Sequence, residues 1–292
     1  MKGLLLLLRL CITLAVVAVA GFCGWYLWDY YMDAPWTRDS RVRVDIIQVA
    51  PDVSGLVTSV NVIDNQTVKT GDVLFVIDRD RYQLALNQAQ ASLESRKATL
   101  AQAQRDLARV TQLSTVSISV AQREQYQSAV DVAQANVREG LASLDIAKLN
   151  LVRTEVHASV DGYVTNLLLR QGDYVTSGTA VLALVDRNSY YVAGYFEETK
   201  LPRIQIGDRA SVRLLGVEQP IDGHVSGIAS GIVDHERMTS PNLLANINPT
   251  FNWVRLAQRI PVRIDLDRVP DGVKLIAGQT ATVVIQPPDQ KK

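Results

Sequence analysis

The sequence is poor in cysteine and carries no excess of charge. Its 292 residues include two cysteines, Cys11 and Cys23, both in the apolar N-terminal segment. The rest of the chain therefore cannot form a disulfide framework or a cysteine-based metal site. Lysine plus arginine equals aspartate plus glutamate at 30 each, so the formal net charge is zero. That balance excludes the strongly basic footprint of a nucleic-acid-binding protein.

Signatures of catalysis and of metal binding are also missing. The histidines, His157, His224 and His235, are far apart and have no ligand-like spacing. There is no G-x-S-x-G, no phosphate-binding loop and no H-E-x-x-H. The adjacent acids Glu197 and Glu198 fit a solvated face or a partner contact better than a catalytic pair. We therefore expect no enzyme, no metal ion and no cofactor.

The N-terminus has the features of a membrane anchor. Residues 10–28 carry no charge, and a helix of that length, at about 1.5 Å per residue, nearly spans a ~30 Å hydrocarbon core. Lys2 and Arg9 precede it, and tryptophans and tyrosines crowd its far end, where an aromatic belt is expected. We expect a cytoplasmic tail at 1–9, a transmembrane anchor at 10–31, and the remainder on the outer side of the membrane.

A cleaved signal peptide is the alternative interpretation of this segment. Ala18-Val-Ala20 offers an A-x-A cleavage site. The apolar stretch continues well past Ala20, however, so cleavage would leave an aromatic-rich stub. Cys23 follows Phe22, which is a poor fit for lipoprotein processing. These observations favour the uncleaved anchor.

A short β-type segment occurs twice in the chain. VSGLVTSVNVIDNQTVKTG runs over Val53–Gly71, and VDGYVTNLLLRQGDYVTSG runs over Val160–Gly178. With one constant offset the two copies share six positions: Val53/Val160, Gly55/Gly162, Val57/Val164, Thr58/Thr165, Val68/Val175 and Gly71/Gly178. Neither copy is long enough to bury a core alone. The repeat therefore predicts two halves of one small β-sandwich.

The segment between the copies is helical in composition. Proline is absent from 79–153, and alanine, glutamine, leucine, arginine and glutamate dominate. Leucines and valines recur at heptad spacing with small residues between them, the one polar intruder being Arg96. STVSIS at 114–119 interrupts the pattern, and Ser119 to Gln122 has the form of a capping box that starts the second arm. We predict an antiparallel coiled-coil hairpin with arms of roughly 50 Å.

The fold class predicted from these patterns is α+β and multidomain. After the N-terminal transmembrane helix it has a split β-sandwich, lipoyl-like by resemblance, with an inserted antiparallel coiled-coil hairpin, and then a C-terminal β-barrel. Short alternating segments after residue 186 predict the barrel strands, and the proline- and asparagine-rich stretch His235–Asn252 predicts a long loop. The expected boundaries are 42–78 plus 154–186 for the sandwich, 79–153 for the hairpin, 187–287 for the barrel and membrane-proximal domain, and 288–292 for a disordered tail.

The repeated half-motif resembles the biotinyl/lipoyl carrier fold. A carrier presents a modified lysine at the turn that joins its two halves. In this chain the helical hairpin occupies that position, and the nearest lysines, Lys69 and Lys148, do not lie at such a turn. The resemblance therefore implies a scaffold without the attachment site.

The order of anchor, split sandwich, hairpin and barrel resembles the membrane fusion proteins of the HlyD type. These are the periplasmic adaptors of tripartite efflux and type I secretion systems. Four strings are similar to the p-hydroxybenzoic acid (aromatic carboxylic acid) efflux adaptors within that family. They are APWTRD (Ala34–Asp39), APDVSGLVTSVNVIDNQ (Ala50–Gln66), YFEETKL (Tyr195–Leu201) and WVRLAQRIPVRIDLD (Trp253–Asp267).

The resemblance implies a role in transport without catalysis. The chain would be a single-pass protein of the bacterial inner membrane, with its bulk in the periplasm. Anchor and barrel would dock on an inner-membrane transporter of the aromatic acid exporter type, and the hairpin tip on a TolC-like outer-membrane channel. The adaptors would form a ring, usually a hexamer.

Tip residues of the family can be matched to this chain only in part. Many adaptors carry an arginine, a leucine four residues on and then a serine that contacts the channel. Arg109 and Leu113 match the first two. Ser119 matches the third if it caps the second arm, but the regular spacing would put the serine at Gln122. The tip loop is thus expected to be about three residues longer than usual.

Other functions remain open from the residues alone. The chain could serve a multidrug transporter of the major facilitator type or an ABC type I secretion pump. It could also be a structural envelope tether without transport, or a degenerate carrier subunit of a membrane enzyme.

Overall fold

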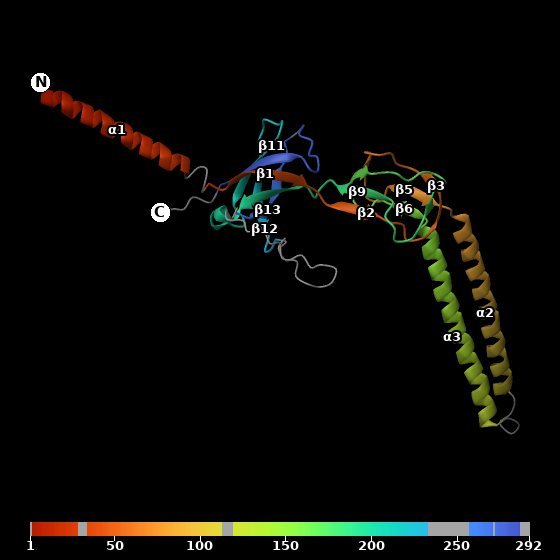
Figure 1. Ribbon diagram of the computed structural model, residues 1–292. Coiled ribbons are helices and arrows are strands. Elements are labelled where there is room, and N and C mark those ends of the chain that lie inside the picture. The colour runs from red at the N-terminus through yellow and green to blue at the C-terminus, as the bar shows by residue number, and fades with distance from the viewer. Residues whose placement is uncertain (1, 29–33, 113–118, 233–256, 271, 287–292) are drawn as a thin grey trace, which may run out of the picture. The chain divides into compact units, whose positions relative to one another are not determined.

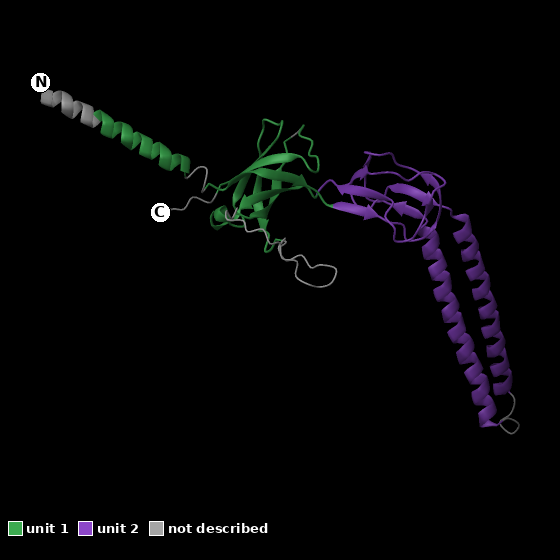
Figure 2. Cartoon of the chain, in the orientation of Figure 1, with its two compact units in different colours: residues 1–45, 189–292 green, residues 46–188 purple. Residues whose placement is uncertain are grey.

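The chain forms two compact units, and the sequence of one is inserted into the sequence of the other. They comprise residues 1–45 with 189–292, and residues 46–188 (Figure 2). The computed structural model describes residues 2–28, 34–112, 119–232, 257–270 and 272–286, with side chains from residue 12 onwards (Figure 1). The predicted loop at His235–Asn252 and the predicted tail at 288–292 lie outside these residues.

The inserted unit contains the predicted β-sandwich. One sheet has the order β2 (Ile46–Val49), β9 (Leu182–Asp186), β7 (Gly162–Thr165), β4 (Thr67–Val68). The other has the order β6 (Glu155–His157), β5 (Val73–Ile77), β3 (Gly55–Val60), β8 (Tyr174–Val175). Each sheet therefore takes strands from both copies of the repeat, as expected for two halves of one sandwich.

Hydrogen bonds across the sandwich obey a pseudo-two-fold symmetry. The amide of Gly71 in the first copy donates to the carbonyl oxygen of Ala158 at 2.8 Å. The matching amide of Gly178 in the second copy donates to the carbonyl oxygen of Pro51 at 3.0 Å. Each half thus satisfies backbone groups of the other, and neither half is complete alone.

One side-chain contact is repeated by the same symmetry but differs in charge. Asp161 accepts hydrogen bonds from the amide of Thr70 at 2.7 Å and from its hydroxyl at 2.9 Å. At the matching positions, the hydroxyl oxygen of Ser54 accepts from the amide of Ser177 at 2.9 Å. The backbone and side-chain hydrogen bonds from Thr70 lower the pKa of Asp161 below its usual value.

The repeat glycines lie where strands approach too closely for a side chain. A Cβ on Gly162 would stand 2.0 Å from the carbonyl oxygen of Val185 on the neighbouring strand β9. A Cβ on the matching Gly55 would stand 2.7 Å from a side-chain methyl of Ile77. The repeated glycine therefore reflects packing between strands. Phe75, Leu74 and Leu184 fill the core around it.

The predicted hairpin is inserted in the chain between the two halves of the sandwich. Helix α2 (Asp80–Gln112) and helix α3 (Val120–Val152) pack side by side in opposite directions (Figure 1). Their buried seam residues are Leu93, Val130, Ala133, Gly140, Leu144 and Ala147. These are heptad positions, so the seam follows the sequence pattern.

The other unit contains a closed six-stranded barrel. Its order is β1 (Trp36–Arg43), β10 (Tyr191–Glu197), β13 (Arg259–Arg268), β12 (Ile221–Ile228), β11 (Arg209–Leu214), β14 (Thr280–Gln286), returning to β1. Phe196, Leu214, Ile221 and Ile264 are fully buried inside it. A short 3₁₀ helix, Glu198–Arg203, follows β10.

Strand β1 corrects one expected boundary. The sequence placed the start of the sandwich at residue 42, but Val42 pairs with Val192 of β10 and points into the barrel core. The sandwich begins only at Ile46. Alternation runs on through both segments, so the change of sheet is visible only in their long-range pairing.

The N-terminal segment is helical. Helix α1 spans Lys2–Trp28 and covers residues 10–28 of the predicted anchor, whose last three residues, 29–31, lie outside the described residues. Within the part of the chain that the structure describes, no helix meets the length and apolarity required to cross a membrane. The anchor and the membrane location stay predictions.

Candidate functional site

The hairpin tip is the first candidate site. Arg109 lies in the last turn of α2 with its side chain 71% exposed, 3.4 Å from the carboxylate of Asp106. Ser119 is the N-cap of α3, and its hydroxyl accepts from the amide of Gln122 at 3.3 Å. Leu113 lies outside the described residues. Ser119 thus performs the predicted capping; a contact of these residues with a channel stays a prediction.

The polar intruder of the heptad seam locks the two helices together. Arg96 of α2 donates to the carbonyl oxygen of Asn136 at 2.9 Å and to the carboxylate of Glu139 at 2.6 Å. The hydrogen bond from Arg96, followed by its charge, lowers the pKa of Glu139. Gly140 of α3 leaves space for the Arg96 side chain, since a Cβ on Gly140 would stand 3.1 Å from both Arg96 and Leu93.

The base of the hairpin is tied to the sandwich. The phenol of Tyr82 in α2 donates to the carbonyl oxygen of Ser54 at 2.7 Å. Arg79, just before α2, forms an ion pair with Glu155 of β6. Thr154, fully buried, donates to the carbonyl oxygen of Leu151 at the end of α3. These contacts hold both arms where the chain leaves and re-enters the sandwich.

Separated sequence strings meet at the end of the barrel where β1 begins, here called the β1 rim. The ammonium of Lys200, which is 6% exposed, lies 5.3 Å from the ring centre of Trp36. The hydroxyl of Thr37 donates to the carbonyl oxygen of Tyr195 at 2.8 Å. Arg259 forms an ion pair with Asp39. The β1 rim therefore joins residues of APWTRD, YFEETKL and WVRLAQRIPVRIDLD.

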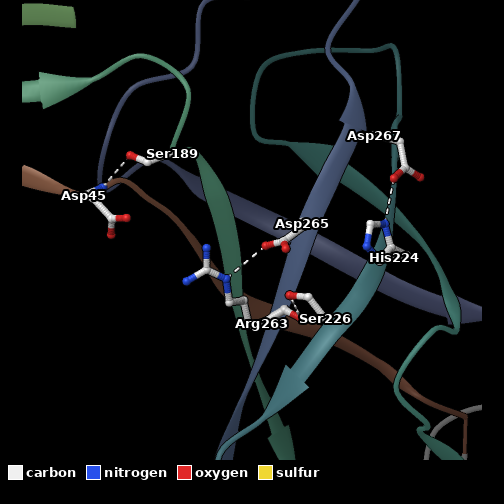
Figure 3. A network of polar contacts seen from close by, with 7 residues as sticks. All are labelled: Asp45, Ser189, His224, Ser226, Arg263, Asp265 and Asp267. Atoms are coloured by element: carbon white, nitrogen blue, oxygen red, sulfur yellow. Dashed lines mark hydrogen bonds and ion pairs between the residues drawn. The ribbon is translucent and has the colours of Figure 1, made fainter. Parts of the chain in front are cut away.

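Another group of polar contacts covers the outer face of β12 and β13 (Figure 3). His224 lies 2.7 Å from the carboxylate of Asp267, and the Nε of Arg263 lies 3.0 Å from that of Asp265. The hydroxyl of Ser226 donates to the carbonyl oxygen of Arg263 at 3.4 Å. Sequence reasoning did not find this group, since it depends on the register between two strands distant in the chain.

A hydrogen bond joins the two chain segments that connect the barrel to the inserted unit. The amide of Asp45, after β1, donates to the hydroxyl of Ser189, before β10, at 2.8 Å (Figure 3). The chain therefore leaves the barrel and returns to it at adjacent points.

Neither metal-binding nor carrier features emerge from the described residues. No group of three or more His, Cys, Asp or Glu side chains in the described ranges could hold a metal ion, and His235 lies outside them. Lys148 lies on the exposed side of α3, 3.5 Å from Asp145. Lys69 follows β4, where its amide donates to Asp72 at 2.8 Å.

Comparisons with known proteins agree with this architecture. Residues 45–187 match the family described as "RND MFP, barrel-sandwich hybrid domain", and residues 189–286 match the "AAEA-like beta-barrel domain". The uncharacterized protein YdhJ of Escherichia coli (strain K12) is 41% identical over 273 residues, which are 94% of this chain and 96% of that protein.

Solved structures share the fold. The membrane fusion protein Spr0693 from Streptococcus pneumoniae R6 has a TM-score of 0.64 at 15% identity, over 85% of this chain and 97% of that one. A MacA–MexA chimeric protein carrying the Pseudomonas aeruginosa MexA α-hairpin has a TM-score of 0.62 at 20% identity, over 88% of this chain and 83% of that one.

The fold therefore defines a membrane fusion protein architecture: split sandwich, inserted hairpin and barrel. With the matched domains and the relative at 41% identity, the chain belongs to the membrane fusion protein family. Members of this family are adaptors of efflux systems that carry out no catalysis, so the prediction that the chain is not an enzyme is confirmed.

Proposed function

We propose that the chain is the periplasmic adaptor subunit of a tripartite efflux system, anchored in the bacterial inner membrane by α1. It links an inner-membrane transporter to a TolC-like outer-membrane channel and assembles as a ring, most simply a hexamer. The observation that carries this proposal is the long hairpin inserted in a split sandwich, whose arms are locked by Arg96 and whose base is tied down by Tyr82. A rigid arm of this kind suits a spacer between two partners.

The cargo we propose is aromatic carboxylic acids. The support is that three of the four strings similar to the aromatic acid adaptors meet at the β1 rim. There Trp36 contacts Lys200, and Asp39 contacts Arg259, so residues far apart in the chain form one surface. A shared surface of this kind suits recognition of a common transporter type.

In-cell cross-linking of the tagged full-length chain, followed by identification of copurified membrane proteins, tests both parts. An aromatic-acid-exporter-type transporter recovered with a TolC-like channel would support the adaptor and its cargo. A major facilitator or ABC transporter instead would keep the adaptor and overturn the cargo. Neither partner, in cells where other envelope complexes are captured, would favour the structural tether.

A substitution at the hairpin tip tests the channel contact. Leu113→Asp will abolish export of p-hydroxybenzoate while leaving thermal unfolding unchanged, because a charge in an apolar contact is costly to desolvate. Gln104→Asp, at an exposed site of α2 away from the tip, is the matched control and should retain export. Full export in Leu113→Asp would show that the tip assignment is wrong.

A further inference from the structure

A hollow of about 570 Å³ lies on the outer face of the barrel, over β1, β10, β12 and β13. Its position follows from small residues between large ones. The outward-facing residues of β10 are Tyr191, Ala193 and Tyr195. The small side chain of Ala193 therefore forms the floor, between two large tyrosine rings. On the far side, Gly227 lies at an irregularity in the β12–β13 register and supplies no side chain.

A fixed cation forms one wall of the hollow. The guanidinium of Arg263, which is opposite Ala193 in the β10–β13 register, stacks 4.0 Å from the ring centre of Tyr191. Its Nε is paired with Asp265 at 3.0 Å (Figure 3). Because the ion pair uses Nε, the Nη groups are the part of this guanidinium that a ligand can approach. The stacked, paired side chain is thereby oriented in advance.

A second cation stands on the opposite wall. Arg43 at the end of β1 is opposite Tyr191 in the register, yet its Nη2 reaches the phenol oxygen of Tyr195 at 3.3 Å. Its side chain therefore extends along the sheet toward Tyr195, and both residues line the hollow together with Ala193. Two guanidinium groups and two aromatic rings thus surround a floor without bulk, and within the described part of the chain no carboxylate is among the lining residues.

We propose that this hollow binds a small aromatic monocarboxylate. Guanidinium groups bind carboxylates through charge-assisted hydrogen bonds, and the ring of Tyr195 offers a face against which a planar apolar ring packs, while Arg263 stacks on Tyr191. Asp265 offsets one of the two positive charges, so the site matches a ligand of one negative charge. As a cargo site it rests on the proposed function, whereas binding itself is a property of the barrel.

The test uses the purified full-length chain in detergent and isothermal titration with benzoate and 4-hydroxybenzoate. Two further probes separate charge from shape: cyclohexanecarboxylate has the charge without the planar ring, and benzamide has the ring without the charge. We expect the two aromatic acids to bind and both other probes to bind at least about tenfold more weakly.

Variants connect the binding to this hollow. Arg263→Gln and Arg43→Gln should each weaken benzoate about tenfold, and Ala193→Leu should fill the floor and abolish binding. Arg213→Gln removes an exposed arginine of β11, a strand that does not line the hollow, and should leave affinity unchanged. Circular dichroism melts check that each variant is folded.

Equal affinities for benzoate and cyclohexanecarboxylate, or unchanged benzoate binding in Arg263→Gln, would overturn the proposal. This result is distinguishable from failure of the adaptor role, because the titration needs no transporter or channel. A chain that copurifies with its partners but binds no aromatic acid would lose only the cargo site.

Discussion

Asp161 and Ser54 occupy symmetry-related positions in the sandwich, but only Asp161 carries a charge. Both accept a hydrogen bond from the amide of a residue in the opposite repeat, Thr70 for Asp161 and Ser177 for Ser54. The sandwich thereby allows an ionised and a neutral acceptor to be compared at equivalent positions of the repeat.

Asp161→Asn is expected to lower the melting temperature at pH 7. The hydrogen bonds from Thr70 depress the folded-state pKa of Asp161, so its stabilisation is complete above the unfolded-state pKa of about 4. That stabilisation is lost as the pH falls through the depressed folded-state value. The difference from wild type should therefore narrow as the pH is lowered below 4, which thermal melts across pH can measure.

Ser54→Ala is the matched control for this pH dependence. It removes a neutral hydrogen-bond acceptor, so its destabilisation should be the same across the pH range. A deficit in Asp161→Asn that stayed constant down to pH 2 would contradict the assignment of the stabilisation to the charge.

Gly162 and Gly55 offer another comparison at the residue scale. Gly162→Ala should cost about 2–3 kcal/mol of unfolding free energy, because its Cβ would overlap a backbone oxygen that cannot move alone. Gly55→Ala should cost less, since the group it meets is the end of the Ile77 side chain. Urea unfolding of both variants measures the difference, and equal costs would argue against backbone overlap as the cause.

At the scale of elements, the second hairpin helix begins at a defined cap. Ser119 has the extended backbone of an N-cap, and its hydroxyl accepts from the amide of Gln122. Capping alone accounts for a serine at this position, so a direct contact with a channel needs separate evidence.

Two substitutions at Ser119 distinguish capping from channel contact. Ser119→Ala should destabilise the chain by about 1 kcal/mol in urea unfolding, and Ser119→Asp should restore stability because aspartate caps equally well. If capping is the whole role, Ser119→Asp will also export p-hydroxybenzoate normally. Restored stability without restored export would instead assign the hydroxyl to the channel.

Elements were predictable from the sequence to the extent that their signals are local. Heptads gave the hairpin, including Leu93 and Leu144 in the seam, and the repeat predicted a sandwich built from both copies. Strand β1 was assigned partly to the wrong sheet, because period-two alternation does not say which partner a strand pairs with. The partners of Arg96 were likewise unpredicted, since they lie on the other helix.

The candidate sites divide in the same way. Ser119 could be predicted as a cap because the capping pattern is contained in a few consecutive residues. The hollow over Ala193 could not, although the alternation of tyrosine and alanine was visible, because Arg263 and Gly227 join it only through strand register.

At the scale of the whole molecule, the units are nested in the chain. Residues 46–188 contain every strand of both sandwich sheets and both hairpin helices. The barrel instead takes β1 from before this insertion and its other five strands from after it. The two units should therefore differ in whether they survive as continuous fragments.

Residues 46–188 expressed alone should be soluble and unfold in one cooperative transition. Residues 189–292 alone should aggregate, because without β1 the strands β10 and β14 become open edges. Circular dichroism and size-exclusion chromatography measure both outcomes. Fusing residues 34–45 after Gln286 through a short linker should rescue the barrel, since the amide of Ile285 already bonds to Pro35 at 2.9 Å. A soluble, folded 189–292 fragment would refute the requirement for β1.

The nesting also sets an order of events during synthesis. Strand β1 is the first strand to be synthesised, but its pairing partner β10 follows only after the whole inserted unit. The barrel can close only when β14, near the C-terminal end of the chain, has been made. The sandwich and hairpin can be finished long before that. During synthesis the hairpin can therefore fold before the barrel does. A chain truncated ahead of β14 would carry a complete hairpin next to an unclosed barrel.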